Sequence, residues 1–144
     1  MNFVTQAVAR RHIMAPAERL FDAWIEPAVV GTWMFGANVR EEEIVSLETD
    51  PKLGGRYSFV VRREGKLFEH AGQYLEVDRP RRLSFTWGVR QQDHESRVHV
   101  EIVPLEKGCE VAVTQDLSAE WADFRPRAEE AWRHMLEALD RALR

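Results

Sequence analysis

The stretch PRAEEAWRHMLEALDRAL, residues 126–143, decides the fold more than any other part of the chain. Its apolar residues recur at three- and four-residue spacings, which places them on one side of a helix. Arginines and glutamates occupy the other side, and Pro126 suits the first turn of a helix, where its missing N–H would have no partner. A helix with so wide an apolar stripe needs a large apolar surface to pack against. The stripe consists of Ala128, Trp132, Met135, Leu136, Leu139 and Leu143.

Upstream of this helix the hydrophobic period is close to two, which indicates β-strands. The segments with this pattern are 39–48, 54–62, 67–77, 82–89, 96–103 and 109–116. Short connections containing glycine or proline separate them, so we expect consecutive strands to pair antiparallel. The apolar surface that the helix needs is then one face of this sheet.

The N-terminal part adds one strand and two short helices. Residues 3–13 alternate loosely, and Ala15-Pro16 then allows a helix to begin. Glu26-Pro27 ends that helix and opens a second one. The predicted fold class is therefore α+β, with a curved antiparallel sheet of about seven strands wrapped around the long C-terminal helix. We expect one domain, residues 1–144.

Composition excludes several classes of protein. The 144 residues are 44% hydrophobic, which supplies one core without disulfides or a structural metal. The net charge of -4 is spread along the chain, so nucleic acid is not an expected partner. The single cysteine, Cys109, fits a reducing cytoplasm. No apolar stretch approaches membrane-spanning length and no export signal is present, so we predict a cytoplasmic protein without a membrane partner.

No catalytic or metal site stands out. The histidines at 12, 70, 94, 99 and 134 show no metal-ligand spacing, so neither a metal nor a cofactor is expected. Cys109 lies in an apolar alternation and no Gly-x-Ser-x-Gly turn exists, so no nucleophilic triad is predicted. His99 alternates with two valines and is expected to face solvent. Four strand carboxylates are also expected on a solvated face, namely Glu41, Glu43, Glu69 and Glu76.

The segment RHIMAPAERLFDAW, residues 11–24, resembles the opening of proteins similar to the activator of the heat-shock-protein-ninety ATPase. Further matches to this family, which belongs to the START-like, Bet v-like helix-grip (SRPBCC) superfamily, cover nearly the whole chain. They are Pro27, Trp33, LGG at 53–55, GQY at 72–74, PRRLSFTW at 80–87, and Ala131-Trp132 with Leu136 and Leu139. The resemblance implies the helix-grip fold. Bacterial members commonly carry a second tryptophan and a proline after Trp33, where this chain has Met34-Phe35-Gly36, so a relative's ligand should not be transferred.

A sheet curved around one helix leaves a wedge-shaped gap unless side chains fill it, and the resemblance implies that this gap is a ligand cavity. We expect it to open near residues 33–36 and to bind a small apolar molecule. Tyr74, Arg56 or a strand glutamate would supply an orienting polar contact. The candidate walls are Trp33, Phe35, Phe59, Tyr74, Phe85, Trp87, Trp132 and Met135.

Two other functions remain open. A polyketide cyclase or dehydratase-like enzyme of the same superfamily would need a carboxylate or histidine with a perturbed pKa facing the cavity. A co-chaperone would contact a heat-shock ATPase through its sheet surface. A chaperone partner is not expected, because the chain has no room for the extra N-terminal domain of the eukaryotic activator. Pairing of two copies into a homodimer is left open.

Overall fold

The computed structural model describes residues 2–90 and 95–144. Within them, seven strands form one antiparallel sheet in the order β1-β7-β6-β5-β4-β3-β2. The strands are β1 (Phe3–Ile13), β2 (Glu43–Thr49), β3 (Arg56–Arg63), β4 (Lys66–Asp78), β5 (Arg82–Val89), β6 (Glu95–Pro104) and β7 (Cys109–Ser118). The helices are α1 (Ala17–Asp22), α2 (Pro27–Trp33), the 3-10 helix η1 (Ala119–Phe124) and α3 (Arg125–Ala142).

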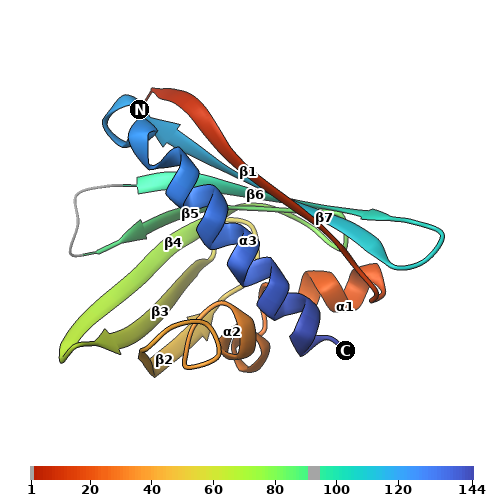
Figure 1. Ribbon diagram of the computed structural model, residues 1–144, viewed down its shortest axis with the longest axis horizontal. Helices are drawn as coiled ribbons and strands as arrows, with labels where there is room; N and C mark the ends of the chain where they lie inside the picture. Colours follow the sequence, from red (N-terminus) through yellow and green to blue (C-terminus); the bar gives the residue numbers. More distant parts are fainter. Residues whose placement is uncertain (1, 91–94) are drawn as a thin grey trace.

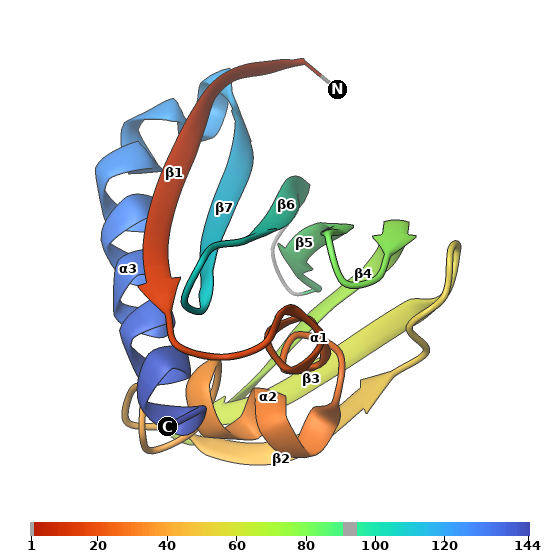
Figure 2. The ribbon, with the colours of Figure 1, turned by 90° about the vertical axis from the view of Figure 1, so that its right-hand side faces the viewer.

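The sheet curves around α3, which lies across one of its faces (Figure 1). The turned view shows the sheet running from β1, beside α3, to β2, with α2 between the C-terminal end of α3 and β2 (Figure 2). This is the helix-grip arrangement, and the predicted α+β fold class is confirmed.

Helix α3 holds the concave face through the stripe that its sequence predicts. Trp132, Met135, Leu136, Leu139 and Leu143 are all buried, while Ala128 is half-buried. The opposite side of α3 is polar, and no helix of the described residues is long and apolar enough to cross a membrane. The helix therefore uses its apolar side for the sheet and its polar side for water.

Polar contacts fasten α3 to the edge of the sheet. The backbone N–H of Val8, on the edge strand β1, donates to the Glu129 carboxylate at 2.9 Å. In the last turn of the helix, the Asp140 carboxylate accepts a hydrogen bond from Arg11 at 3.0 Å. Because an exposed strand edge carries unpaired backbone groups, these contacts partly cover the edge of β1.

The two faces of the sheet follow the alternation expected from sequence. On β6, Val98 and Val100 are buried and His99 faces the outer side, as predicted. Cys109, at the start of β7, is 2% exposed and packs in the core, as its apolar surroundings indicated.

The predicted strand 39–48 begins too early. The structure starts β2 at Glu43, because the backbone N–H groups of Val39 and Arg40 both donate to the carbonyl of Gly36. Gly36 has φ of 100°, a conformation that favours glycine, and it turns the chain after α2. Residues 36–42 therefore form a loop that packs on the end of the core.

Candidate ligand-binding site

The eight predicted wall residues come together between α3 and the concave face of the sheet. Seven of them are at most 5% exposed and belong to one hydrophobic cluster. The eighth, Trp87, is half-buried and packs against that cluster. The chain brings them together from five elements and the loop after α2: Trp33 (α2), Phe35 (loop), Phe59 (β3), Tyr74 (β4), Phe85 and Trp87 (β5), Trp132 and Met135 (α3).

Trp87 is the centre of this aromatic cluster. Its ring centroid lies 5.6 Å from that of Trp132 on α3, 6.0 Å from Phe85 and 6.3 Å from Phe35. Phe35 in turn lies 5.4 Å from Phe59. Such offset and edge-to-face ring pairs are favourable beyond the area that they bury. The interval between the helix and β3–β5 is therefore bridged by aromatic side chains.

A chain of buried hydrogen bonds ties the helix to the sheet beneath these rings. The indole N–H of Trp132 donates to the Gln115 side-chain oxygen at 2.9 Å. The Gln115 amide nitrogen donates to Ser96 at 2.9 Å, and the Ser96 hydroxyl donates to the carbonyl of Trp87 at 3.2 Å. All three links are satisfied inside the protein, so they fix Trp132 and Trp87 relative to each other.

Two members of the cluster, Tyr57 and His70, were not among the eight predicted wall residues. Tyr57 contacts four of its rings and donates its hydroxyl to the carbonyl of Thr86 at 2.5 Å. His70 lies 5.0 Å from Phe35 and 5.3 Å from Trp87. The signal was present, because His70 and Tyr74 are four residues apart on one strand and so share a face.

His70 is buried, 9% exposed, and its two ring nitrogens have different roles. Nε2 lies 3.2 Å from a guanidinium nitrogen of Arg63. Arginine only donates, so Nε2 must accept and the neutral ring carries its proton on Nδ1. Nδ1 is inaccessible and has no hydrogen-bond partner among the described residues. Burial, with Arg63 and Arg40 nearby, lowers the pKa of His70 to about 4, so the ring is neutral at physiological pH.

A buried carboxylate organises the loop beside His70. The side chain of Glu42 is 0% exposed and pairs with Arg40 at 3.1 Å and Arg63 at 2.9 Å. It also accepts the backbone N–H of Gly36 at 2.8 Å. Glu42 was not among the predicted carboxylates, of which Glu41, Glu43 and Glu76 are exposed and Glu69 is half-buried.

We expect Glu42→Gln to lower the free energy of unfolding by about 2 kcal/mol, because two arginines and Gly36 then lose a charged acceptor. The arginine side chains are 31% and 35% exposed, so water limits the loss. Glu43→Gln is the matched control, since its pair with Arg62 is exposed on both sides. Urea unfolding of both variants measures the difference, and equal midpoints would contradict a structural role for Glu42.

Two sequence expectations about the site are wrong. Residues 33–36, predicted to line an opening, are all buried, and the backbone of Gly36 is held by the buried Glu42 side chain. Arg56, predicted as a polar contact, is exposed: it alternates with the buried Tyr57 and so lies on the outer face.

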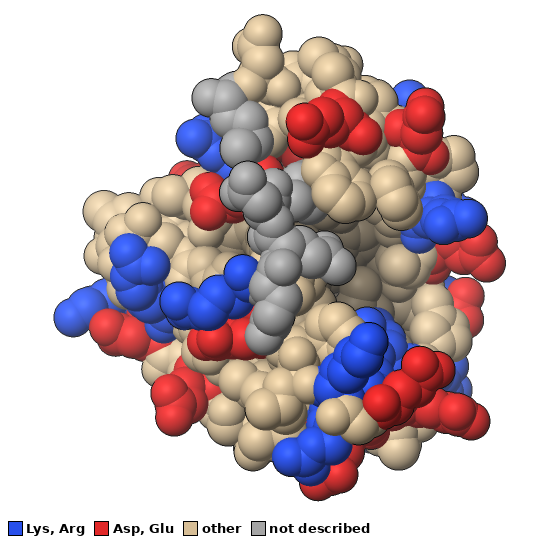
Figure 3. Space-filling view, turned by 90° about the vertical axis from the view of Figure 1, so that its left-hand side faces the viewer, with Lys and Arg blue, Asp and Glu red and all other residues tan. Residues whose placement is uncertain are grey.

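Figure 3 views the end of the molecule where β5 ends and β6 begins, and its surface is hollowed near the centre. Trp87, near that end of β5, keeps exposed surface.

The outer face carries a Ser-His-Asp chain that the residue spacing did not predict. Ser84 lies 2.9 Å from Nδ1 of His99, and Nε2 of His99 lies 2.8 Å from Asp116. Ser84 is 7% exposed, however, and sits within a paired strand whose N–H groups serve the sheet. A serine nucleophile needs space for a substrate carbonyl beside it and free N–H groups that can stabilise the oxyanion. Ser84 has neither, so these three residues are explained as a cross-strand polar ladder.

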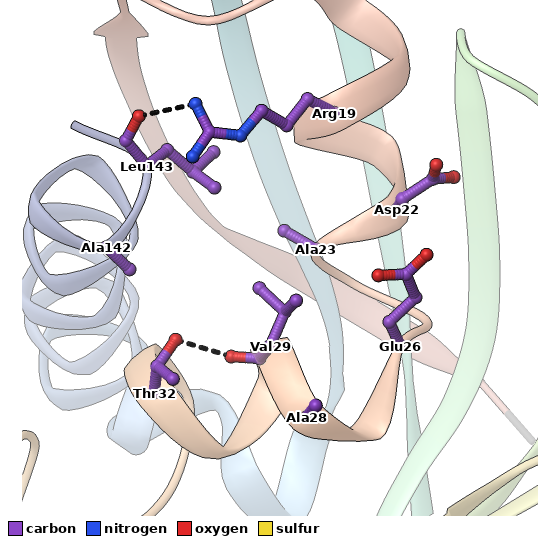
Figure 4. A pocket seen from close by; sticks show the side chains of 9 residues that line it. All are labelled: Arg19, Asp22, Ala23, Glu26, Ala28, Val29, Thr32, Ala142 and Leu143. Carbon is purple, nitrogen blue, oxygen red and sulfur yellow. Dashed lines mark hydrogen bonds between the residues drawn. The ribbon is translucent and has the colours of Figure 1, made fainter.

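A separate groove lies on the surface between α1, α2 and the C-terminal end of α3 (Figure 4). Its volume is about 480 Å³. Arg19 crosses one end and donates to the carbonyl of Leu143 at 2.8 Å. Asp22, on its rim, is already held by Arg79 through two hydrogen bonds of 2.7 and 2.8 Å. Two of the three charged residues that line the groove, Arg19 and Asp22, are thus already engaged within the protein, so it is a weaker candidate than the aromatic cluster. Among the described residues no group of histidine, cysteine and carboxylate side chains could hold a metal ion.

The curved sheet, the long C-terminal helix and the aromatic cluster between them define a protein of the helix-grip class. The family model described as "Activator of Hsp90 ATPase homolog 1-like protein" matches residues 14–144, and the chain belongs to that family. No curated protein matches the chain.

Solved structures of similar proteins share the fold. A solution structure from Cytophaga hutchinsonii has 25% sequence identity and a TM-score of 0.78, over 98% of this chain and 94% of that one. An Activator-of-Hsp90-ATPase-homolog-1-like protein from Aeromonas hydrophila has 21% identity and a TM-score of 0.80, over 96% and 91%. DynU16, a putative protein in the dynemicin biosynthetic locus, has 17% identity and a TM-score of 0.77, over 96% of this chain and 46% of that one.

Proposed function

We propose that the protein binds a small apolar molecule between α3 and the concave face of the sheet. The observation that carries the proposal is the aromatic cluster, in which rings from α3, β3, β4, β5 and the loop after α2 converge on the half-buried Trp87. Ligand sites are concave and mostly apolar, with a small number of polar groups that fix orientation. The aromatic rings would supply the apolar lining of such a site, and His70 is the polar group in contact with them.

Trp87 is the entry point in this proposal. The other seven predicted wall residues have almost no free surface, so a guest can meet them only after a ring moves. Trp87 is half-buried and contacts Trp132, Phe85 and Phe35. A planar apolar molecule that displaces the Trp87 ring would recover the ring contacts that the displacement breaks.

The protonation states favour binding over acid–base catalysis. Burial raises the pKa of Tyr57 and Tyr74, and burial lowers the pKa of His70 to about 4, so these three groups are neutral near pH 7. The basic nitrogen of His70, Nε2, already accepts from Arg63, and the other ring nitrogen, Nδ1, carries the proton. A general base needs a free lone pair and a pKa near the working pH, and His70 has neither.

We expect the hydrocarbon dye diphenylhexatriene to bind the native protein and to be excited by energy transfer from tryptophan. Met135→Trp should weaken this binding about tenfold, because the larger ring fills the space next to Trp132. Met14→Trp is the matched control, since Met14 is 63% exposed and outside the cluster. Thermal melts establish that both variants are folded. Absence of dye binding, or equal weakening by both variants, would contradict the proposal.

A further inference from the structure

The core contains a hydrogen-bond donor that the fold itself does not use. Two buried side-chain atoms have no hydrogen-bond partner among the described residues, Nε1 of Trp24 and Nδ1 of His70. Trp24 packs nearly perpendicular to Trp33, with ring centroids 4.6 Å apart, and aromatic faces accept weak N–H contacts. His70 has the stronger unmet requirement. Buried polar groups are paired in the great majority of cases, so an unpaired one requires an explanation.

The His70 ring that carries this donor is a member of the aromatic cluster. Arg63 holds Nε2 at 3.2 Å, which fixes the proton on Nδ1. The ring packs against Phe35 and Trp87, so Nδ1–H is sealed by side chains rather than by solvent. Trp87 is also the half-exposed member of the cluster. A guest that displaces the Trp87 ring would therefore lie against the His70 ring.

The charges behind His70 favour an electron-rich partner. Arg40 and Arg63 both pair with Glu42, which leaves this group of three side chains with one excess positive charge. The same two arginines contribute to the low pKa of His70, so the ring meets a ligand as a neutral donor. Such a donor matches a neutral acceptor oxygen, and a carbonyl is the acceptor that a flat apolar molecule can carry with little desolvation.

We propose that the site selects apolar molecules that carry a carbonyl oxygen, and that His70 is the specificity-determining residue, donating its Nδ1–H to that oxygen. This inference rests on the proposed function, because it requires a ligand among the aromatic rings. It adds the chemical class of the ligand and the residue that recognises it.

Two compounds of the same shape test the selection. 9-Fluorenone and fluorene differ at one position, where a carbonyl replaces a methylene group. By equilibrium dialysis we expect the wild-type protein to bind fluorenone about tenfold more tightly than fluorene, the factor expected for one good hydrogen bond to a buried donor. His70→Phe should bind the two compounds equally, since it keeps an aromatic ring and removes the donor. His99→Phe is the matched control on the outer face and should keep the wild-type preference.

The outcomes separate this inference from the proposed function. Equal binding of the two compounds by the wild type, or a preference that survives in His70→Phe, overturns the role of His70 and leaves apolar binding intact. If the protein binds diphenylhexatriene but neither tricyclic compound, the carbonyl selection is overturned and apolar binding again remains. If no apolar compound binds, both proposals fall. Should His70→Phe fail to fold, nitrogen NMR of the wild type decides: fluorenone should shift the His70 Nδ1 resonance and fluorene should not, and equal shifts overturn the proposal.

Discussion

Trp132→Ala is expected to lower the free energy of unfolding by roughly 3 to 5 kcal/mol, the range observed for truncation of large buried aromatic side chains. Trp132 is 2% exposed, and its ring centroid lies 5.6 Å from that of Trp87 and 6.0 Å from that of Trp24. It is the large side chain by which α3 reaches β5, so its loss leaves a cavity between helix and sheet. Gln115 also loses the donor that satisfies its oxygen. Chemical unfolding followed by circular dichroism measures the change.

Two further variants separate the causes. Trp132→Phe keeps a ring in place and removes the N–H, so it should cost about 1 to 3 kcal/mol, the penalty for one unsatisfied buried acceptor together with a smaller ring. Arg133→Ala alters the next residue on the exposed side of α3 and should change stability by less than about 0.5 kcal/mol. If all three variants unfold at the same denaturant concentration, α3 does not hold the sheet as described.

The helix and the strands could be predicted from sequence because their signals are local. The stripe of Trp132, Leu136 and Leu139 needs only the 3.6-residue period, and the structure buries all three. Four of the eight wall residues lie on strands whose inner face is apolar, and alternation places them there: Phe59, Tyr74, Phe85 and Trp87. Whether they enclose a ligand stays a prediction, because alternation assigns a face and not the space beside it.

The polar part of the site depends on contacts between distant residues, and the sequence pattern does not contain them. One partner of the buried Glu42 is Arg63, which lies 21 positions further along the chain at the end of β3. A run of three glutamates at 41–43 gives no sign that its middle member is inside. His70 could have been assigned to the inner face by its spacing from Tyr74. That its Nδ1 would be left as a free donor follows only from the position of Arg63.

The second large effect is a loss of stability in mild acid that His70 causes. The pKa of His70 is about 4 in the folded protein, against 6.5 for the unperturbed side chain. Between these values the unfolded chain binds a proton that the folded protein does not. The free energy of unfolding therefore falls as the pH falls from 6.5 toward 4. The contribution of neutral, buried His70 to stability is fully present above pH 6.5. A shift of this size corresponds to about 3 kcal/mol across the window.

His70→Phe should remove this dependence. Carboxylates also titrate toward the lower end of the window, so the quantity to measure is the difference in unfolding free energy between wild type and variant at each pH. We expect the wild type to lose about 3 kcal/mol relative to His70→Phe between pH 7 and pH 4. Arg63 and Arg40 face His70 from the charged side and Phe35 and Trp87 from the apolar side, and none of these four changes its charge in this range. Parallel pH profiles for the two proteins would mean that folded His70 takes up a proton as readily as the unfolded chain does, and burial would then not keep its ring neutral in mild acid.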